Sequence, residues 1–236
     1  MAKQMIGDAP RRRRSTRGGT VLSAELIIET ALRMLEQHGR EGLSARRLAA
    51  ALGADASTLY RYFRGMDDLA LAIGDALIAG ALRDWRRSGD WKSDLRAFGL
   101  RIYSSYLAHP QAAVLTASRV SGLPNEIAGD EIILSMLLDA GFPRRDAARI
   151  YHVFIDQCLA FACLDAAGLA LPEPALRADE AMWQTTYATL PASTHPGIAA
   201  TARHLAARMT RSAYPDALDT LLYCAATELT RHKSRR

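Results

Sequence analysis

Apolar residues recur at intervals of three and four from about residue 21 almost to the C-terminus, and this periodicity constrains the fold more than any other feature. Such spacing gathers apolar side chains on one face of an α-helix, whereas a half-buried strand would alternate with a period of two. Proline and glycine interrupt the pattern at intervals, as at Gly122–Pro124 and Gly141–Pro143. The sequence therefore predicts an all-α fold.

The first quarter of the chain predicts one helix followed by two short ones. The first begins near Ser23, which can accept a backbone hydrogen bond as N-cap, and ends at Gly39. The short helices are expected over 44–52 and 57–63, and a fourth begins after Gly65 and extends toward Trp85. The rest of the chain predicts helices near 92–108, 111–121, 125–140, 144–168, 175–190, 196–210 and 213–232.

The two short helices have the composition of a helix-turn-helix. Ala49 allows the helices to approach closely, and Gly53 permits the tight turn between them. Apolar side chains on the inner faces would form a small core, which leaves donors and an aromatic pointing outward. The inner set is Leu48, Leu52, Leu59 and Phe63, and the outer set is Arg46, Ser57, Thr58, Arg61 and Tyr62. Side chains of the outer kind suit phosphates and base edges in the major groove.

Residues 21–70 also resemble, in register and without a gap, the DNA-binding domain of the TetR family of bacterial repressors. The resemblance implies an N-terminal three-helix helix-turn-helix domain followed by a larger helical domain for ligand binding and dimerisation. The matching segments are His38-Gly39, Glu41-Gly42-Leu43-Ser44, Arg47-Leu48-Ala49, Leu52-Gly53, Ser57-Thr58-Leu59-Tyr60-Arg61-Tyr62-Phe63 and Asp68-Leu69.

The resemblance implies a role for individual residues. Arg46 is similar to a position that contacts a base or phosphate, and Tyr60 to a tyrosine that packs inward while its hydroxyl reaches the backbone. Arg61 is the strongest candidate for base recognition, because a guanidinium can bind O6 and N7 of guanine together; contact with phosphate alone remains the alternative. The complete set expected to bind DNA is Ser44, Arg46, Ser57, Thr58, Tyr60, Arg61, Tyr62 and Arg64.

One position departs from the family pattern. Many members have a phosphate-binding lysine where this chain has Met66, at the start of the fourth helix. A thioether cannot bind a phosphate in that way. Arg64, two residues earlier, is the expected substitute, together with the free N–H groups at the helix N-terminus.

Charge is distributed unevenly along the chain. Residues 1–66 carry a net charge of +6 and residues 231–236 one of +4, whereas residues 67–230 carry −5. This asymmetry points to an anionic partner at one end of the molecule. Residues 1–20 are expected to be a disordered basic arm, either a phosphate- or minor-groove-binding segment or a solubilising tail. Its arginines are Arg11, Arg12, Arg13, Arg14 and Arg17.

The body is expected to carry the dimer interface and an effector pocket. The helices over 147–169 and 213–229 are more apolar than one core contact requires, so we expect them to pair with their symmetry mates as a four-helix bundle. Pocket candidates are the aromatic residues of the body, although core packing is the competing explanation for each. They are Tyr103, Tyr106, Tyr151, Phe154, Phe161, Trp183 and Tyr187.

The sequence thus predicts a disordered arm over 1–20, a helix-turn-helix domain over 21–68 and an effector-binding, dimerising domain over 69–236. The expected function is a homodimeric repressor that binds a palindromic operator through the major groove and is released by a small-molecule effector; activation is not excluded. The alternatives are a sequence-independent DNA-binding protein and a helical enzyme acting on an acidic substrate.

No catalytic residue, cofactor or metal site is predicted. His152 and Asp156 have the spacing of two metal ligands on one helix, but no third ligand is evident. Three cysteines without CxxC spacing argue against a disulfide framework or zinc site. No apolar run reaches the roughly 20 residues that a membrane span needs, and no secretory signal is recognised. The expected location is therefore the cytoplasm, without membrane attachment.

Overall fold

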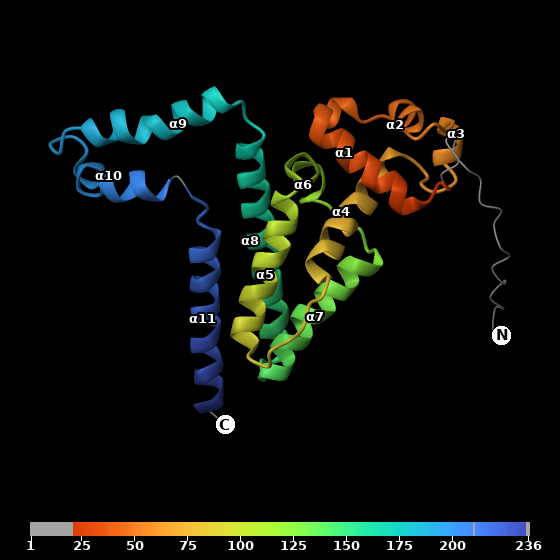
Figure 1. Cartoon of the computed structure of the whole chain (residues 1–236). Helices are drawn as coiled ribbons and strands as arrows, with labels where there is room; N and C mark the ends of the chain where they lie inside the picture. Colours follow the sequence, from red (N-terminus) through yellow and green to blue (C-terminus); the bar gives the residue numbers. More distant parts are fainter. Residues whose placement is uncertain (1–20, 210, 235–236) are drawn as a thin grey trace. The chain divides into compact units, whose positions relative to one another are not determined.

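The computed structural model describes residues 21–209 and 211–234. Its secondary structure in these ranges consists of helices, and no strand is found there. The predicted all-α class is confirmed. The chain divides after Leu69 into two compact units. The first contains α1 (Ala24–Gly42), α2 (Ala45–Ala51) and α3 (Ala56–Leu59), and α4 (Met66–Leu82) begins there and continues in the second (Figure 1).

Local sequence determines where α1 begins and bends. The Ser23 hydroxyl accepts a hydrogen bond from the backbone N–H of Leu26 at 3.2 Å and so caps the helix. Gly39 has φ 63° and ψ −172°, which takes the chain out of the helical path near the predicted end. Ile27 and Leu35 are fully buried on the inner face, together with Leu48 of α2. Burial of each such side chain contributes roughly 1.5–3 kcal/mol.

The second unit is built around α8 (Arg144–Leu169). This helix packs against α5 (Trp91–Leu107), α6 (Pro110–Thr116), α7 (Pro124–Ala140) and α11 (Tyr214–Ser234). In Figure 1, α5, α8 and α11 run side by side. Their close approach depends on Gly99 of α5, because a Cβ there would lie 2.7 Å from the Tyr214 hydroxyl and 3.0 Å from the Phe154 ring.

The length and composition of α8 alone would allow it to cross a membrane, contrary to the expectation that no such run exists. The sequence reading was wrong here because it looked for an unbroken apolar run, whereas α8 reaches the same mean hydropathy with charged residues interspersed. Its contacts with four other helices are those of the central helix of a bundle. Only 22% of its most apolar stretch is buried within the chain, so much apolar surface remains exposed.

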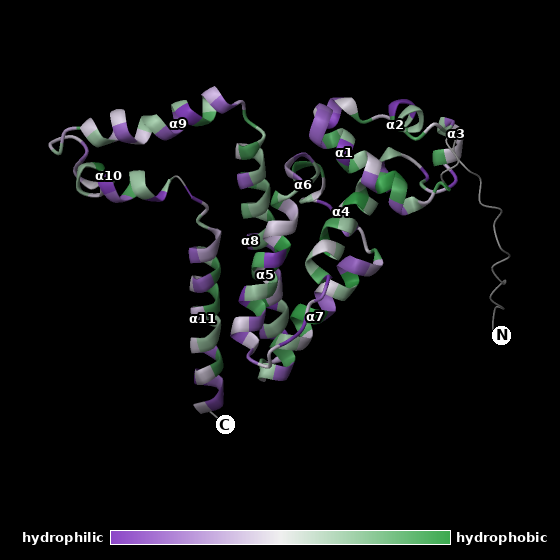
Figure 2. Ribbon diagram, viewed as in Figure 1, coloured by the Kyte–Doolittle hydropathy of each residue, from purple (hydrophilic) through white to green (hydrophobic). Residues whose placement is uncertain are grey.

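A helical hairpin connects α8 to α11. It consists of α9 (Glu173–Thr185), the short 3₁₀ turn η1 (Tyr187–Thr189) and α10 (Pro196–Arg208), which pack on one another. No residue of α9 is buried, and Ala202 is the single buried residue of α10. Hydrophobic and hydrophilic residues alternate along both helices (Figure 2).

Candidate DNA-binding surface and ligand cavity

The start of α2 sets the direction of two neighbouring arginines. Ser44 caps the helix, since its hydroxyl accepts the backbone N–H of Arg47 at 3.4 Å. The Arg47 guanidinium bonds to the carbonyl of Glu41 at 3.0 Å. Arg46 is exposed, and no hydrogen bond or ion pair is found for it within the described part of the chain. Arg46 is therefore available to an anionic partner, whereas Ser44 and Arg47 are engaged in holding the turn.

The third helix is shorter than predicted. Its α-helical part ends at Leu59 rather than Phe63, and the next residues form tighter turns in which Arg61 N–H bonds to Thr58 and Tyr62 N–H to Leu59. The helical spacing of apolar residues could not reveal this, because Leu59 and Phe63 are buried in either geometry. Ser57 and Arg61 are exposed on this segment, and Thr58 is half-buried.

The roles expected of the two tyrosines are corrected. Tyr60 does not pack inward, since 54% of its surface is exposed. It is Tyr62 whose hydroxyl reaches the backbone, donating a hydrogen bond to the carbonyl of Leu22 at 2.7 Å. This bond ties the end of the recognition segment to the residue that precedes the N-cap of α1. Tyr62 keeps 40% exposure, so part of the residue is still accessible.

The N-terminus of α4 is organised by Asp68. Its carboxylate accepts the backbone N–H of Arg64 at 3.0 Å, and the Arg64 guanidinium lies 3.9 Å away from its other oxygen. The Arg64 side chain is nevertheless 94% exposed. Such a long, exposed guanidinium can turn from a carboxylate to a phosphate. The arm residues Arg11, Arg12, Arg13, Arg14 and Arg17 lie outside the described residues.

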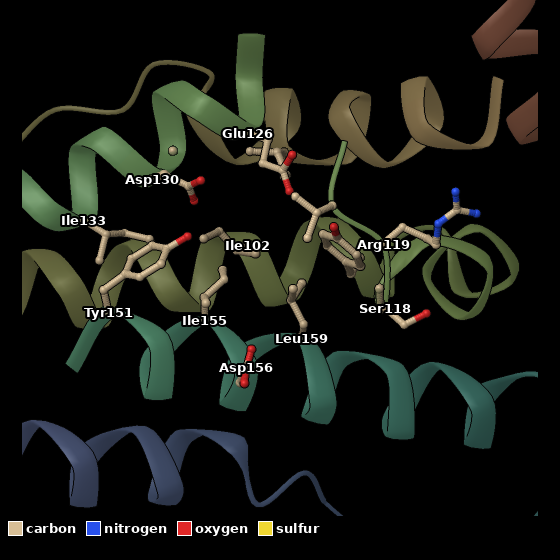
Figure 3. Close-up of a pocket in the computed structure, with 15 residues that line it drawn as sticks. Ile102, Ser118, Arg119, Glu126, Asp130, Ile133, Tyr151, Ile155, Asp156 and Leu159 are labelled. Atoms are coloured by element: carbon tan, nitrogen blue, oxygen red, sulfur yellow. The ribbon is translucent and has the colours of Figure 1, made fainter. Parts of the chain in front are cut away.

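A cavity of about 240 Å³ opens in the second unit between α4, α5, α7 and α8. Its volume is slightly below the range of roughly 300–1,000 Å³ that is usual for small-molecule sites. Most of its wall is apolar, with polar groups concentrated on α7 and on the segment after α6 (Figure 3). The lining residues are Ile78, Ile102, Tyr106, Ala117, Ser118, Arg119, Val120, Glu126, Gly129, Asp130, Ile133, Tyr151, Ile155, Asp156 and Leu159.

Two of the seven predicted pocket residues, Tyr106 and Tyr151, line this cavity. The other five do not. Phe154 is buried against Gly99, and Trp183 stacks on Tyr187 within the hairpin at a ring distance of 4.2 Å.

Tyr103 and Phe161 instead contact α11. The rings of both pack on Tyr214, at 4.8 and 5.8 Å, and the Tyr103 hydroxyl donates to Asp165 at 2.7 Å. Burial, together with Asp165, raises the pKa of Tyr103 to about 12. The reason for the error is angular: residues three positions apart on a helix are turned by about 60° from one another, so Tyr106 faces the cavity while Tyr103 faces α11.

Sequence reasoning missed the carboxylates of the cavity. Glu126 and Asp130 lie one helical turn apart on α7, among apolar neighbours, and this spacing could have identified them. Burial raises the pKa of Asp130; the nearby Tyr151 hydroxyl opposes this shift, and the charge of Glu126 reinforces it. Figure 3 shows Asp130 and Tyr151 pointing toward one another. The Glu126 carboxylate accepts hydrogen bonds from Ser121 and Gly122 and so holds the segment before α7.

A second buried carboxylate connects α4 to the same helix. Asp75 of α4 is 8% exposed and accepts the backbone N–H groups of Asn125 and Glu126, at 3.0 and 2.9 Å. These are otherwise unpaired N–H groups at the start of α7, where the helix dipole favours a negative charge. One helix that leads to the first unit is thereby fastened to one that lines the cavity.

Among the described residues, no group of three His, Cys, Asp or Glu side chains is placed to hold a metal ion. His152 and Asp156 form a pair with each other, with 3.0 Å between Nε2 and Oδ2. Cys158 is fully buried, and burial raises the pKa of its thiol to about 12. Such a thiol is protonated at neutral pH and is a poor nucleophile.

Two family models match the chain. One, described as bacterial regulatory proteins of the tetR family, covers residues 27–73, and the other, described as a tetracyclin repressor-like C-terminal domain, covers residues 86–220. An HTH-type transcriptional regulator of Saccharopolyspora erythraea is 31% identical over 133 residues, or 56% of each chain. The tetracycline repressor protein class C of Escherichia coli is 33% identical over 128 residues, or 53% of this chain and 58% of that protein. The matches therefore span little more than half the length of these relatives.

A solved structure extends the likeness over nearly the whole chain. The structure of a possible TetR family transcriptional regulator from Streptomyces coelicolor A3(2) is 26% identical, with a TM-score of 0.69. The alignment covers 91% of this chain and 100% of that one. The arrangement of helices described above is thus shared beyond the helix-turn-helix.

Proposed function

Because the chain belongs to the TetR family of bacterial regulators, we propose that it is a homodimeric transcriptional repressor that a small molecule releases from its operator. The observation that carries this proposal is the exposed surface of the helix-turn-helix. Arg46, Ser57 and Arg61 are exposed there, and the apolar side chains beneath them are buried. This combination suits insertion into the major groove, and the net charge of +6 over residues 1–66 suits the phosphates.

Within this surface the roles differ. Arg61 is the base-reading residue, because its guanidinium can bind guanine bidentately, and Ser57 and Thr58 donate beside it. Arg46 and Arg64 contact phosphates. Arg64 supplies the phosphate contact that a lysine at the position of Met66 makes in many family members. Tyr60 is exposed enough to contact the sugar-phosphate backbone, and Tyr62 positions the segment through Leu22. Arginines of the N-terminal arm add phosphate or minor-groove contacts.

Dimerisation through α8 and α11 would present two such units to half-sites about 34–36 Å apart, one DNA turn. Support comes from apolar side chains on these helices that their own chain leaves uncovered. Leu164 and Val153 of α8 are 67% and 44% exposed, and Tyr223 of α11 is 67% exposed. Burial of such a stripe against a second copy removes it from water.

A mutation can test this interface. Leu164→Glu should shift the protein toward monomer, as measured by light scattering during size-exclusion chromatography. Ile127→Glu is the matched control, because Ile127 is similarly exposed, at 58%, but lies on α7. A Leu164→Glu protein that remains dimeric would place the interface elsewhere.

The cavity is the proposed effector site, and α4 the route by which an effector acts. Ile78 of α4 lines the cavity, and Asp75 fastens the same helix to α7. A ligand that binds better when α7 or α4 is displaced would shift the population toward a form with lower operator affinity. The name of the relative from Escherichia coli, a tetracycline repressor, is consistent with control of this kind.

Selection from a pool of random duplexes tests the function as a whole. At one stated salt concentration, the protein should enrich a palindrome that it binds about a thousandfold or more tightly than random DNA. Equal affinity for all duplexes would favour the sequence-independent DNA-binding alternative, and affinity for none would remove DNA binding itself. No observation on the described residues favours the enzyme alternative. We propose a cytoplasmic location, where the DNA target lies.

A further inference from the structure

The chemistry of the cavity restricts the class of molecule that it can hold. Its wall is largely isoleucine, leucine, valine and tyrosine, so a ligand must be mostly apolar to gain from burial. Into this wall project Glu126 and Asp130, and Asp156 lies at its exposed side. Arg119 is the one cationic side chain among the described lining residues.

Asp130 is the carboxylate best placed to meet a ligand. Its carboxylate faces the Tyr151 hydroxyl, which is a neutral group, and among the described residues no ion pair compensates its negative charge. Glu126 differs, because three donors from Ser121 and Gly122 already converge on one of its oxygens. In Figure 3, Arg119 lies at the opposite end of the cavity from Asp130. The end of the cavity near Asp130 is therefore negative, and the Tyr151 ring lies beside it.

We propose that the cavity binds an apolar ligand with one positive charge, an aryl-alkyl ammonium in its simplest form, and that Asp130 is the partner of that charge. This inference rests on the proposed function, because it takes the cavity as the effector site. A partly buried carboxylate has already lost much of its hydration, so a ligand cation gains more from it than from a carboxylate in water. The ring of Tyr151, which lies beside Asp130, favours a cation over an anion in the same place.

Burial also raises the pKa of Asp130, which means that burial disfavours the ionised carboxylate. A bound cation would stabilise that ionised form. An anionic ligand would meet Asp130 and Glu126 with like charge. A neutral ligand of the same shape would retain the apolar contacts alone.

Three probes with one carbon skeleton separate these cases: phenylbutylamine, phenylbutanol and phenylbutyrate, which are a cation, a neutral molecule and an anion at neutral pH. Calorimetric titration of the full-length protein without DNA should give the amine about tenfold or more tighter binding than the alcohol. The carboxylate should bind more weakly than both. Equal binding of the three, tighter binding of the carboxylate, or no binding of the amine at about 1 mM would overturn the proposal.

Variants of α7 locate the charge. Asp130→Asn should remove the preference for the amine while the variant still binds the alcohol, and that residual binding shows that the cavity remains intact. Glu131→Gln is the matched control, because it removes the same charge from the next residue, which is exposed and does not line the cavity. An amine preference that survives in Asp130→Asn, or disappears in Glu131→Gln, would contradict the assignment.

The same probes distinguish this inference from the proposed function. Charge-selective binding that depends on Asp130 but leaves operator affinity unchanged would uphold the ligand class and refute effector control by this cavity. Release of the operator by all three probes alike would uphold effector control and refute the ligand class.

Discussion

Asp75 and Asn125 lie 50 positions apart in the chain, yet the Asp75 carboxylate accepts both the backbone N–H of Asn125, at 3.0 Å, and its side-chain amide, at 2.7 Å. The first residue belongs to α4, the helix shared between the two units, and the second to the first turn of α7. Since α7 also supplies Glu126 and Asp130 to the cavity, this pair and the bond from the Glu126 N–H to Asp75 connect a cavity-lining helix to α4.

Replacement of Asp75 by asparagine should weaken that connection. The substitution removes the charge and one acceptor from a buried site, so the free energy of unfolding should fall by about 1–3 kcal/mol in urea titrations. The ratio of operator affinities without and with phenylbutylamine should move toward one, because the ligand would act less on α4. Asp139→Asn, at the exposed end of α7, is the control. An Asp75→Asn protein with unchanged stability and unchanged response would assign the coupling to other contacts.

The bond between Tyr62 and the Leu22 carbonyl predicts a difference between two tyrosines. Tyr62→Phe removes a 2.7 Å hydrogen bond and should lower the free energy of unfolding by about 0.5–1.5 kcal/mol. Tyr60→Phe should leave stability unchanged, because no hydrogen bond of its hydroxyl is found among the described residues. Chemical unfolding followed by circular dichroism measures both. Equal effects of the two changes would mean that the bond to Leu22 contributes no stability.

Arg61 should determine operator preference. Arg61→Ala should reduce affinity for the selected operator by about 1–3 kcal/mol, roughly ten- to a hundredfold, and should relax the preference at one base pair. Arg46→Ala should instead weaken all DNA alike. Arg33→Ala removes the same charge from α1, where Arg33 is paired with Glu29 at 2.9 Å, and serves as control. Fluorescence anisotropy with base-substituted operators measures the preference, and an Arg61→Ala protein with full discrimination would transfer base reading to another residue.

Deletion of residues 1–17 should weaken binding to operator and random DNA by similar factors. The segment contains Lys3 and five arginines. Each phosphate contact that is lost should reduce the slope of log affinity against log salt by about 0.9. Titrations at several salt concentrations measure that slope. If affinity and slope stay as they are, the segment is a tail without a role in DNA binding.

Low pH should selectively remove the contribution of the Asp94 carboxylate to the free energy of unfolding. Its side chain is 3% exposed and accepts hydrogen bonds from the backbone and hydroxyl of Ser88 and from Gly89. Burial by itself raises the pKa of Asp94, but these hydrogen bonds outweigh it and lower the pKa below the usual 3.8. A carboxyl group with a lowered pKa in the folded state stabilises the protein above its unfolded pKa and loses that effect as pH falls through the folded value.

Asp94→Asn should therefore reduce the free energy of unfolding at neutral pH by about 1–3 kcal/mol. The difference from the parent protein should shrink as the pH falls below 3.8. Urea unfolding of both proteins over a series of pH values gives this comparison. A difference that stays constant with pH would mean that the Asp94 charge is not what stabilises the Ser88 turn.

The sequence determined the helical class, most helix boundaries and the place of the helix-turn-helix. These features depend on local chemistry: the spacing of apolar residues, a capping serine at Ser23 or Ser44, and a glycine where φ must be positive, as at Gly39 and Gly53. Each of these features depends on residues that are neighbours in the sequence, so the sequence alone can predict it.

Only the tertiary structure decided which polar and aromatic side chains meet. Tyr62 rather than Tyr60 bonds to the backbone. Its partner, Leu22, lies 40 positions away, so local sequence could not reveal the contact. Tyr106 faces a cavity while Tyr103 faces α11, because a rotation of about 60° along one helix separates two different neighbours. The pairing of Asp130 with Tyr151, and of Asp75 with the start of α7, likewise depends on how helices pack. Helical periodicity indicates which face of a helix is buried, but it does not identify the helix that covers that face.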